Sequence, residues 1–327
     1  MGFIKKVSVV LAIFAMVGVA NAQGKLRIGM QTWADWTQDM TDPGAVMKDE
    51  VSGFSVTRAL VYLNYFYSDN WSVHGAFDFG SESPVDNLFH GYIQGKMGSL
   101  KMQIGRYNSW YVNELDKAMG TRWIMASLAE DNAIGRANDG IVVGGMLGST
   151  IHWDLGINNG PNNLGVVGIP GERSYDIDFH VGASFSDSFG AHLVLRNSTE
   201  GLTTEDTMTY GGAINFNHAM FDMLAEIYLS EDDMAADSVM AWAVTANLKF
   251  NEGNAGFFVN YSMNDTDATV SSNHIVNNNA ESFLKVGPWF KSAENGYKIG
   301  LFYNMAAAND AAFEDASYVN ASFAAKF

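Results

Sequence analysis

The chain has no cysteine and only five prolines among its 327 residues. Without thiols it can form neither a disulfide nor a cysteine-based nucleophile or metal site. Basic residues are also scarce, since 19 lysines and arginines stand against 36 acidic residues, for a net charge of −17. This balance argues against nucleic-acid binding, which needs basic patches. After residue 22, no stretch has the roughly 20 apolar residues that a membrane helix requires.

Residues 1–22 have the pattern of a signal peptide. Lys5 and Lys6 precede an apolar run over 7–19, which is too short to span a bilayer. Ala20-Asn21-Ala22 then forms a cleavage site of the small-x-small type. We therefore expect export, a mature chain that starts at Gln23, and a single domain over residues 23–327, because no linker or low-complexity tract interrupts it.

From residue 25 onward, short stretches of alternating apolar and polar residues recur to the last residue. Alternation with period two is the pattern of a β-strand with two different faces. In residues 219–230, for example, Phe221 and Met223 alternate with Asp222. The sequence predicts sixteen such strands: 25–36, 53–68, 70–80, 87–97, 99–109, 138–147, 149–158, 174–186, 188–197, 206–218, 219–230, 238–250, 252–263, 280–291, 294–305 and 314–327.

The connections between these strands alternate between short and long. The short ones contain turn residues, as in Ser68-Asp69-Asn70 and Gly148-Ser149. This alternation is typical of a closed antiparallel up-and-down β-barrel with tight turns at one rim and loops at the other. An even number of strands places the start of the first strand and the end of the last strand at the same rim, the one with the tight turns.

The apolar face of the barrel must meet lipid, because a charged residue there costs about 2–4 kcal/mol at mid-bilayer. The polar face then lines a water-filled lumen, which sixteen strands make too wide for side chains to fill. A soluble sandwich would show the same alternation. The signal peptide favours the membrane barrel, and so does the alternating C-terminal stretch ending in Phe327, which resembles the last strand of outer-membrane proteins.

The third of the eight long connections, residues 110–137, is the longest. Asn113 can cap a helix there, with Glu114 and Asp116 in the favourable first turn. Leu115 and Met119 follow at helical spacing. Apolar residues are unusual in a loop that faces water, so we expect this connection to be partly helical and to fold into the barrel.

Several motifs around this connection resemble the Gram-negative outer-membrane porins, and among them the superfamily of the phosphate-selective porin O and P type. They are the stretch from Leu100 to Glu114, Gly135-Arg136, Asp139-Gly140 and the stretch from Ile151 to Gly160, all within about a fifth of the chain. The resemblance implies passive diffusion of small hydrophilic solutes and ions through a homotrimer in the outer membrane. Its partners would be membrane lipid and lipopolysaccharide, and it would have no cofactor.

In porins the third loop narrows the pore, with acidic residues on the loop facing basic residues on the wall. By resemblance, the acidic candidates here are Glu114, Asp116, Glu130 and Asp131. The basic candidates are Arg27, Arg58, Lys96 and Lys101 on the wall, and Arg122 and Arg136 on the loop. Arg106 has the apolar parity of its strand and is expected at the rim instead.

The chain departs from the phosphate-selective pattern, which uses an arginine ladder and lysine-rich loops. It has only seven arginines, and its long connections are acidic. We therefore expect a mild preference for cations. A channel selective for anions such as phosphate, or for another solute class, stays open as an alternative, as does a structural or adhesive barrel. The acidic connections could equally bind divalent cations near lipopolysaccharide.

Enzymatic and metal chemistry have no support in the sequence. Five histidines share the lumen parity, which a polar lumen explains, and their spacing fits no zinc motif: they are His74, His90, His152, His180 and His192. No nucleophile or acid pair stands out beside them. We expect no catalytic residues and no metal site.

Overall fold

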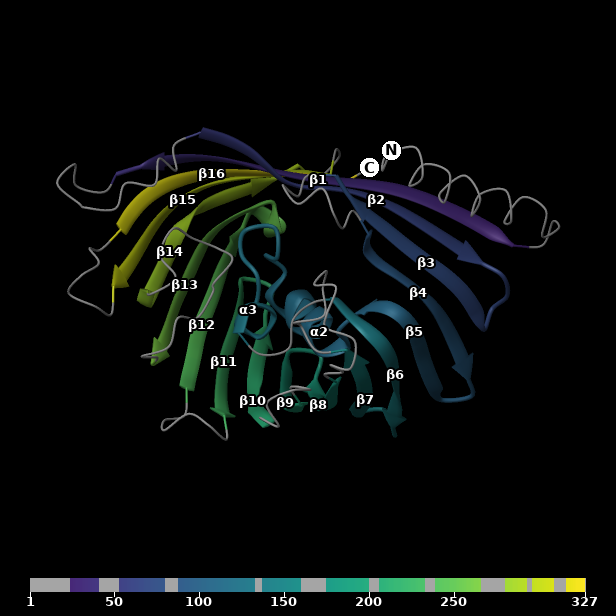
Figure 1. Cartoon of the computed structure of the whole chain (residues 1–327). Coiled ribbons are helices and arrows are strands. Elements are labelled where there is room, and N and C mark those ends of the chain that lie inside the picture. The colour runs from purple at the N-terminus through teal and green to yellow at the C-terminus, as the bar shows by residue number, and fades with distance from the viewer. Residues whose placement is uncertain are drawn as a thin grey trace, which may run out of the picture.

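The computed structural model forms a closed barrel in which every strand pairs with its neighbours in the sequence (Figure 1). It describes residues 24–40, 53–79, 88–132, 137–159, 175–199, 206–232, 239–265, 280–292, 296–308 and 316–326. The expected signal peptide, residues 1–22, lies outside the described residues, and so does the terminal Phe327.

All sixteen expected strands are present, at bounds within a few residues of those predicted. They are β1 (Lys25–Asp39), β2 (Gly53–Phe66), β3 (Trp71–Asp78), β4 (Leu88–Met97), β5 (Leu100–Asn108), β6 (Ala137–Leu147), β7 (Ile151–Asn159), β8 (Tyr175–Ser186), β9 (Phe189–Thr199), β10 (Asp206–Asn217), β11 (Phe221–Asp232), β12 (Val239–Phe250), β13 (Ala255–Asp265), β14 (Ala280–Lys291), β15 (Tyr297–Ala308) and β16 (Ala316–Lys326).

The barrel is closed by the first and last strands. β1 pairs with β2 on one side and, antiparallel, with β16 on the other, from Gln31 opposite Lys326 to Asp39 opposite Tyr318. Among the described strands, each one pairs with a neighbour on both sides, so none forms an open edge of the sheet. The fold prediction, a sixteen-stranded antiparallel barrel, is confirmed.

The two faces of the barrel differ as the alternation predicts. On β9, Leu193 points outward and is 69% exposed, whereas its neighbour His192 points into the lumen and is 8% exposed. On β8, Ile177 and Phe179 are exposed, whereas Asp178 and His180 are buried. The outer surface is thus an apolar belt around the barrel, which is the surface that lipid solvates.

The tight turns lie at one rim, which we call the tight-turn rim. Gly98 and Gly148 occupy two of these turns with φ of 62° and 68°, in the left-handed region that favours glycine. A short 3₁₀ turn, η2 (Asn251–Gly253), joins β12 to β13. Along the chain, these short links alternate with longer connections between the strands, as expected.

Two helices occupy the connection between β5 and β6: α2 (Trp110–Met119) and α3 (Leu128–Asn132). Figure 1 shows both inside the ring of strands. Ser109 is the N-cap of α2, since its Oγ accepts a hydrogen bond from the backbone N of Val112. Asn113, the expected cap, lies within the helix instead. Gly120 ends α2 with φ of 66°.

The helices within the described residues are short. None of them is both long and apolar enough to cross a bilayer.

Candidate functional site

The connection between β5 and β6 folds back against the inner wall. We call residues 109–132 the lumen loop. Tyr111, Leu115 and Met119 of α2 are almost fully buried against Leu224 and Tyr228 of β11. This contact explains the apolar residues of a connection that would otherwise face water, and it confirms the expected inward fold.

A second apolar contact holds the part of the loop that follows α2. Trp123 and Ile124 pack against Phe258, Trp289 and Phe302, which project from β13, β14 and β15. The two clusters fix the loop along one half of the barrel. Burial of each large apolar side chain there stabilises the folded protein by roughly 1.5–3 kcal/mol.

Polar contacts fix the loop at the same wall. The carboxylate of Glu226 on β11 accepts hydrogen bonds from the backbone N of Leu128 and of Ala129, at 3.1 and 3.2 Å, where α3 begins. Lys285 on β14 donates to the carbonyl of Ile124 at 2.8 Å. Asn217 on β10 donates to the carbonyl of Ala118 at 2.7 Å. Buried backbone groups are costly when unpaired, so these side chains determine where the loop can sit.

The hydroxyl of Tyr111 extends this polar network. It lies 2.7 Å from the Tyr228 hydroxyl, which donates to Glu226 at 3.1 Å. Burial raises the pKa of Tyr111 well above its ordinary value, so the phenol keeps its proton and can act as a donor.

A cluster of charged and aromatic side chains lies where the loop approaches β1 and β2, and we call it the constriction cluster. Arg122 of the loop pairs with Glu130 at 2.5 Å and lies over the ring of Trp33, 5.2 Å from its centroid. Arg58 on β2 lies 5.0 Å from the same ring and 4.5 Å from that of Phe89. Two guanidinium groups, one from the loop and one from the wall, therefore flank a single tryptophan in the lumen.

The acidic residues of the loop were expected to face basic residues of the wall, but in the structure they pair mainly with a basic residue of the loop itself. Asp116 and Glu130 both pair with Arg122 of their own loop, Asp116 at 3.6 Å. Arg58 pairs with Asp78 on the neighbouring strand, also at 3.6 Å. The structure thus brings Arg58, Arg122, Asp116 and Glu130 into one region.

The other expected residues lie elsewhere. Glu114 points to histidines of β7 and β9. Arg27 lies over Phe66, and Lys96 lies opposite Lys101 across the β4–β5 turn. Arg106 lies opposite Asp139 on the outward parity. Arg136 and the side chain of Asp131 lie outside what the structure describes.

Arg196 on β9 is a buried lumen cation that the sequence analysis missed. Its Nε and Nη2 donate to the two oxygens of Asp178 at 2.6 and 3.0 Å. The two residues are direct cross-strand partners, and each is nine positions from Asp187 in the tight turn. Counting equal numbers of residues outward from Asp187 along both strands would have predicted this cross-strand pair.

Further basic residues gather at the tight-turn rim on the lumen parity, and we call them the rim cations. Lys291 lies directly opposite Lys298, as Lys96 does opposite Lys101. Only Lys249 has a described ion pair among them, with Asp222 at 2.8 Å. The rim cations are Lys25, Arg27, Lys96, Lys101, Lys249, Lys291, Lys298 and Lys326.

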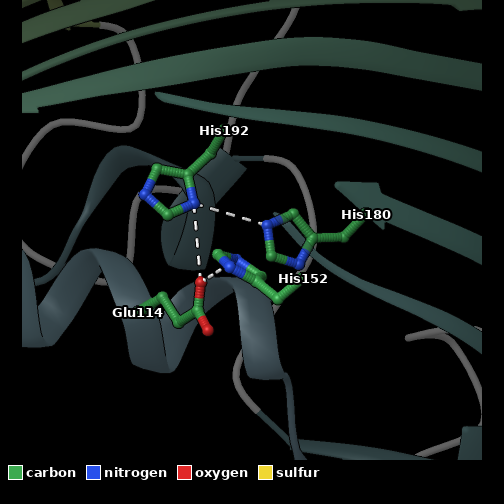
Figure 2. A group of neighbouring side chains, drawn as sticks. All are labelled: Glu114, His152, His180 and His192. Carbon is green, nitrogen blue, oxygen red and sulfur yellow. Dashed lines mark hydrogen bonds and ion pairs between the residues drawn. The ribbon is translucent and has the colours of Figure 1, made fainter. Parts of the chain in front are cut away.

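A group of four side chains joins α2 to the adjacent wall strands β7, β8 and β9 (Figure 2). Glu114 of α2 meets His152 of β7, His180 of β8 and His192 of β9. Burial opposes ionisation of the Glu114 carboxyl, but contact with His152 and the nearby His180 and His192 outweighs it and lowers the pKa of Glu114.

A closed barrel of sixteen strands whose third long connection folds into the lumen is the fold of the outer-membrane porins. Solved structures of that class match almost the whole chain. OmpF of Salmonella typhi, in complex with daunomycin, matches with a TM-score of 0.67 and 10% identity over 93% of this chain and 98% of its own. The anion-selective porin of Comamonas acidovorans matches with a TM-score of 0.66 and 12% identity, over 93% and 100%.

A loop-deletion mutant of OmpT, an outer membrane protein of Vibrio cholerae, matches with a TM-score of 0.64 and 11% identity, over 94% of this chain and 100% of its own. At such identities the likeness establishes the fold. No protein-family model and no curated protein matches the chain. The narrower resemblance to the phosphate-selective porin O and P type stays a prediction.

Proposed function

We propose that this chain is an outer-membrane porin, a water-filled channel through which small hydrophilic solutes and ions diffuse passively. The observation that carries the proposal is the lumen loop, which is fixed inside a closed barrel whose inner face is polar. A barrel with an adhesive or purely structural role needs no such inward element. The proposal assigns the chain no catalytic role and no cofactor.

The proposed location is the outer membrane, reached by means of the signal peptide 1–22. The apolar belt supports contact with lipid, and the acidic connections would lie near lipopolysaccharide. We also propose a homotrimer. Its support is the fold alone, together with a similar structure described as a trimer form of the Vibrio cholerae OmpT.

The proposed constriction lies between the lumen loop and β1, β2 and β4. It comprises Arg122 and Glu130 on the loop and Trp33, Arg58 and Phe89 on the wall. Charged side chains at a narrow point orient and filter polar solutes. The net charge of −17 supports a mild preference for cations.

A second candidate is a channel that prefers anions, and the rim cations favour it. Two of their pairs place lysines directly opposite each other, an arrangement that destabilises a sheet and is expected where the positive potential itself is useful. Anions that enter from that rim would meet these charges before they reach the constriction.

Conductance of the purified protein in a planar bilayer, with a salt gradient across it, tests the proposal. We expect discrete open steps and a small reversal potential that favours cations. A reversal potential that favours anions would replace the first candidate with the second. Folded protein that inserts but gives no conductance would contradict both.

A further inference from the structure

Four side chains with metal-ligating atoms converge in the lumen from four separate elements. They are Glu114 of α2, His152 of β7, His180 of β8 and His192 of β9. One ligand atom from each lies within 4.8 Å of every other. Figure 2 shows the Glu114 carboxylate directed toward the rings of His152 and His192, with His180 beside His192.

Gly182 makes this convergence possible. It is the direct cross-strand partner of both His152 and His192, so the three residues form one row across β7, β8 and β9. A Cβ at Gly182 would lie 2.0 Å from Nε2 of His152 and 2.8 Å from Nδ1 of His192. Only a residue without a side chain leaves room for the two rings to approach each other over the strand.

Neighbouring residues fix which ring nitrogens carry protons. Nδ1 of His180 lies 2.7 Å from Asp154 Oδ2, and a carboxylate oxygen only accepts, so the proton is on Nδ1. Nε2 of His192 lies 3.2 Å from the amide oxygen of Asn215, so its proton is on Nε2. Asn215 in turn donates through Nδ2 to Asn217, which fixes the orientation of its amide.

The remaining nitrogens of His180 and His192 therefore present lone pairs to the same point. Nε2 of His180 and Nδ1 of His192 are 3.4 Å apart, and in neutral rings neither can donate to the other. Nδ1 of His192 is also 3.5 Å from Oε2 of Glu114. Oε2 of Glu114 and Nε2 of His152 form an ion pair, so Nε2 of His152 carries a proton, which a bound metal ion would displace.

We propose that this cluster is a binding site for one divalent transition-metal ion, with Zn²⁺ as the preferred occupant. Four ligands at zinc's bond lengths of about 2.0–2.1 Å in a tetrahedron lie about 3.4 Å from one another, as the two separations of 3.4 and 3.5 Å do. Three imidazoles and one carboxylate favour zinc over magnesium or calcium, which take oxygen ligands.

The surroundings of the cluster match those of metal sites. Asp154 and Asn215 orient His180 and His192 through the ring nitrogens that do not face the cluster, the role that outer carboxylates and amides have around metal ligands. His180 and His192 are buried, whereas the side chains of Glu114 and His152 are 31% and 18% exposed. That pair faces the lumen and leaves a path by which an ion can enter.

The bound ion would fasten α2 to β7, β8 and β9. The two apolar clusters and the polar contacts described above hold the lumen loop to strands β9 to β16. A metal bridge at Glu114 extends this attachment to β7 and adds to the contact that the Tyr111 ring already makes with His180 of β8. The site is thus a clamp on the inward loop, and it goes beyond the proposed diffusion channel.

Zinc titration of folded, tag-free protein in detergent tests the proposal. The protein is first treated with a chelator, and binding is then measured in competition with a colorimetric chelator. We expect one zinc per chain, at least about 100-fold weaker binding in His152→Asn and Glu114→Gln, and about 10- to 100-fold weaker binding in Asp154→Asn. His74→Asn changes another lumen histidine, which hydrogen-bonds to Ser72 and Asn64 and lies outside the cluster, and should leave binding unchanged.

Co²⁺ supplies a second measurement, because tetrahedral cobalt absorbs visible light far more strongly than the hydrated ion. The strong bands should appear with the wild-type protein and His74→Asn, and should be lost in Glu114→Gln. Absence of stoichiometric zinc, or equal loss in His74→Asn and His152→Asn, would overturn the metal site. None of these measurements uses a bilayer, so a lack of conductance would leave the result intact.

Discussion

Single side chains of the wall determine the position of the lumen loop. Glu226 is the clearest case, because one buried carboxylate accepts hydrogen bonds from two backbone N–H groups at the start of α3 and from Tyr228. Such a carboxylate also interacts favourably with the N-terminal end of a helix. A wall residue thus supplies the hydrogen-bond acceptors and the negative charge that the loop itself does not provide at the start of α3.

Glu226→Gln should destabilise the protein by about 1–3 kcal/mol, since an amide can accept these hydrogen bonds less well and places a donor among donors. The free energy of unfolding in urea measures the loss. Glu252→Gln, the same change in the exposed η2 turn, is the matched control and should have almost no effect. Equal stabilities of the two variants would contradict the anchoring role.

Arg58 is the wall cation of the constriction cluster, and its positive charge should repel cations and attract anions that pass through the lumen. Arg58→Gln should shift the reversal potential toward cations, because a lumen positive charge beside Trp33 is removed. Arg106→Gln is the control, since Arg106 has the outward parity. The same shift in both variants would mean that the effect arises from net charge and not from the constriction.

At the scale of an element, the lumen loop acts as one body attached to the wall. Deleting residues 113–130 removes most of the loop's part of the two apolar clusters, so conductance should rise and selectivity should weaken. Conductance steps in a planar bilayer measure the change. Steps of unchanged size would show that the loop does not limit the flow of ions.

The hairpin between β4 and β5 has a like-charge pair, Lys96 opposite Lys101. Lys96→Gln should stabilise the protein by about 0.2–1 kcal/mol, because like charges directly opposite each other repel. The free energy of unfolding in urea measures this gain. Lys25→Gln is the control, since Lys25 lies opposite Phe66 and not opposite another lysine. A loss of stability would mean that Lys96 has a favourable contact.

The strands and several residues of the constriction cluster were predictable from the sequence, whereas the meeting of Glu114 with the lumen histidines was not, for one physical reason. Alternation and turn residues are local, so they predicted the sixteen strands, and counting from Asp187 could also have given the pairing of Asp178 with Arg196, which the sequence analysis missed. The meeting of Glu114 with His152 depends on how a connection folds across the lumen, and no spacing encodes that. The N-cap was misplaced because Ser109 and Asn113 are both good caps, and packing of Tyr111 and Val112 selects the earlier one.

At the scale of the whole molecule, the basic residues of the described strands gather near one end of the barrel. The rim cations gather at the tight turns, whereas the sequences that connect the opposite strand ends contain acidic residues such as Asp42, Asp49, Asp310 and Glu314. A pore with opposite charges at its two mouths conducts unequally in the two directions.

The current–voltage curve of single channels should therefore be asymmetric. The asymmetry should fade with added salt, since the screening length falls from about 10 Å at 0.1 M to about 3 Å at 1 M. Replacing Lys291 and Lys298 with glutamine should reduce it at low salt. A curve that is symmetric at 0.1 M would contradict the axial separation of charge.

The pairing of β1 with β16 has a consequence for how the molecule is assembled. Asp35 and Asn320 touch across that seam although 285 positions separate them in the chain. Bringing such distant segments together from a flexible chain would cost about 5 kcal/mol in closure entropy. Neighbouring hairpins remove most of this cost when they form first, because each one shortens the remaining gap. The seam is therefore the natural last step of folding, and until it forms two bare edges remain that neither lipid nor a neighbouring strand satisfies.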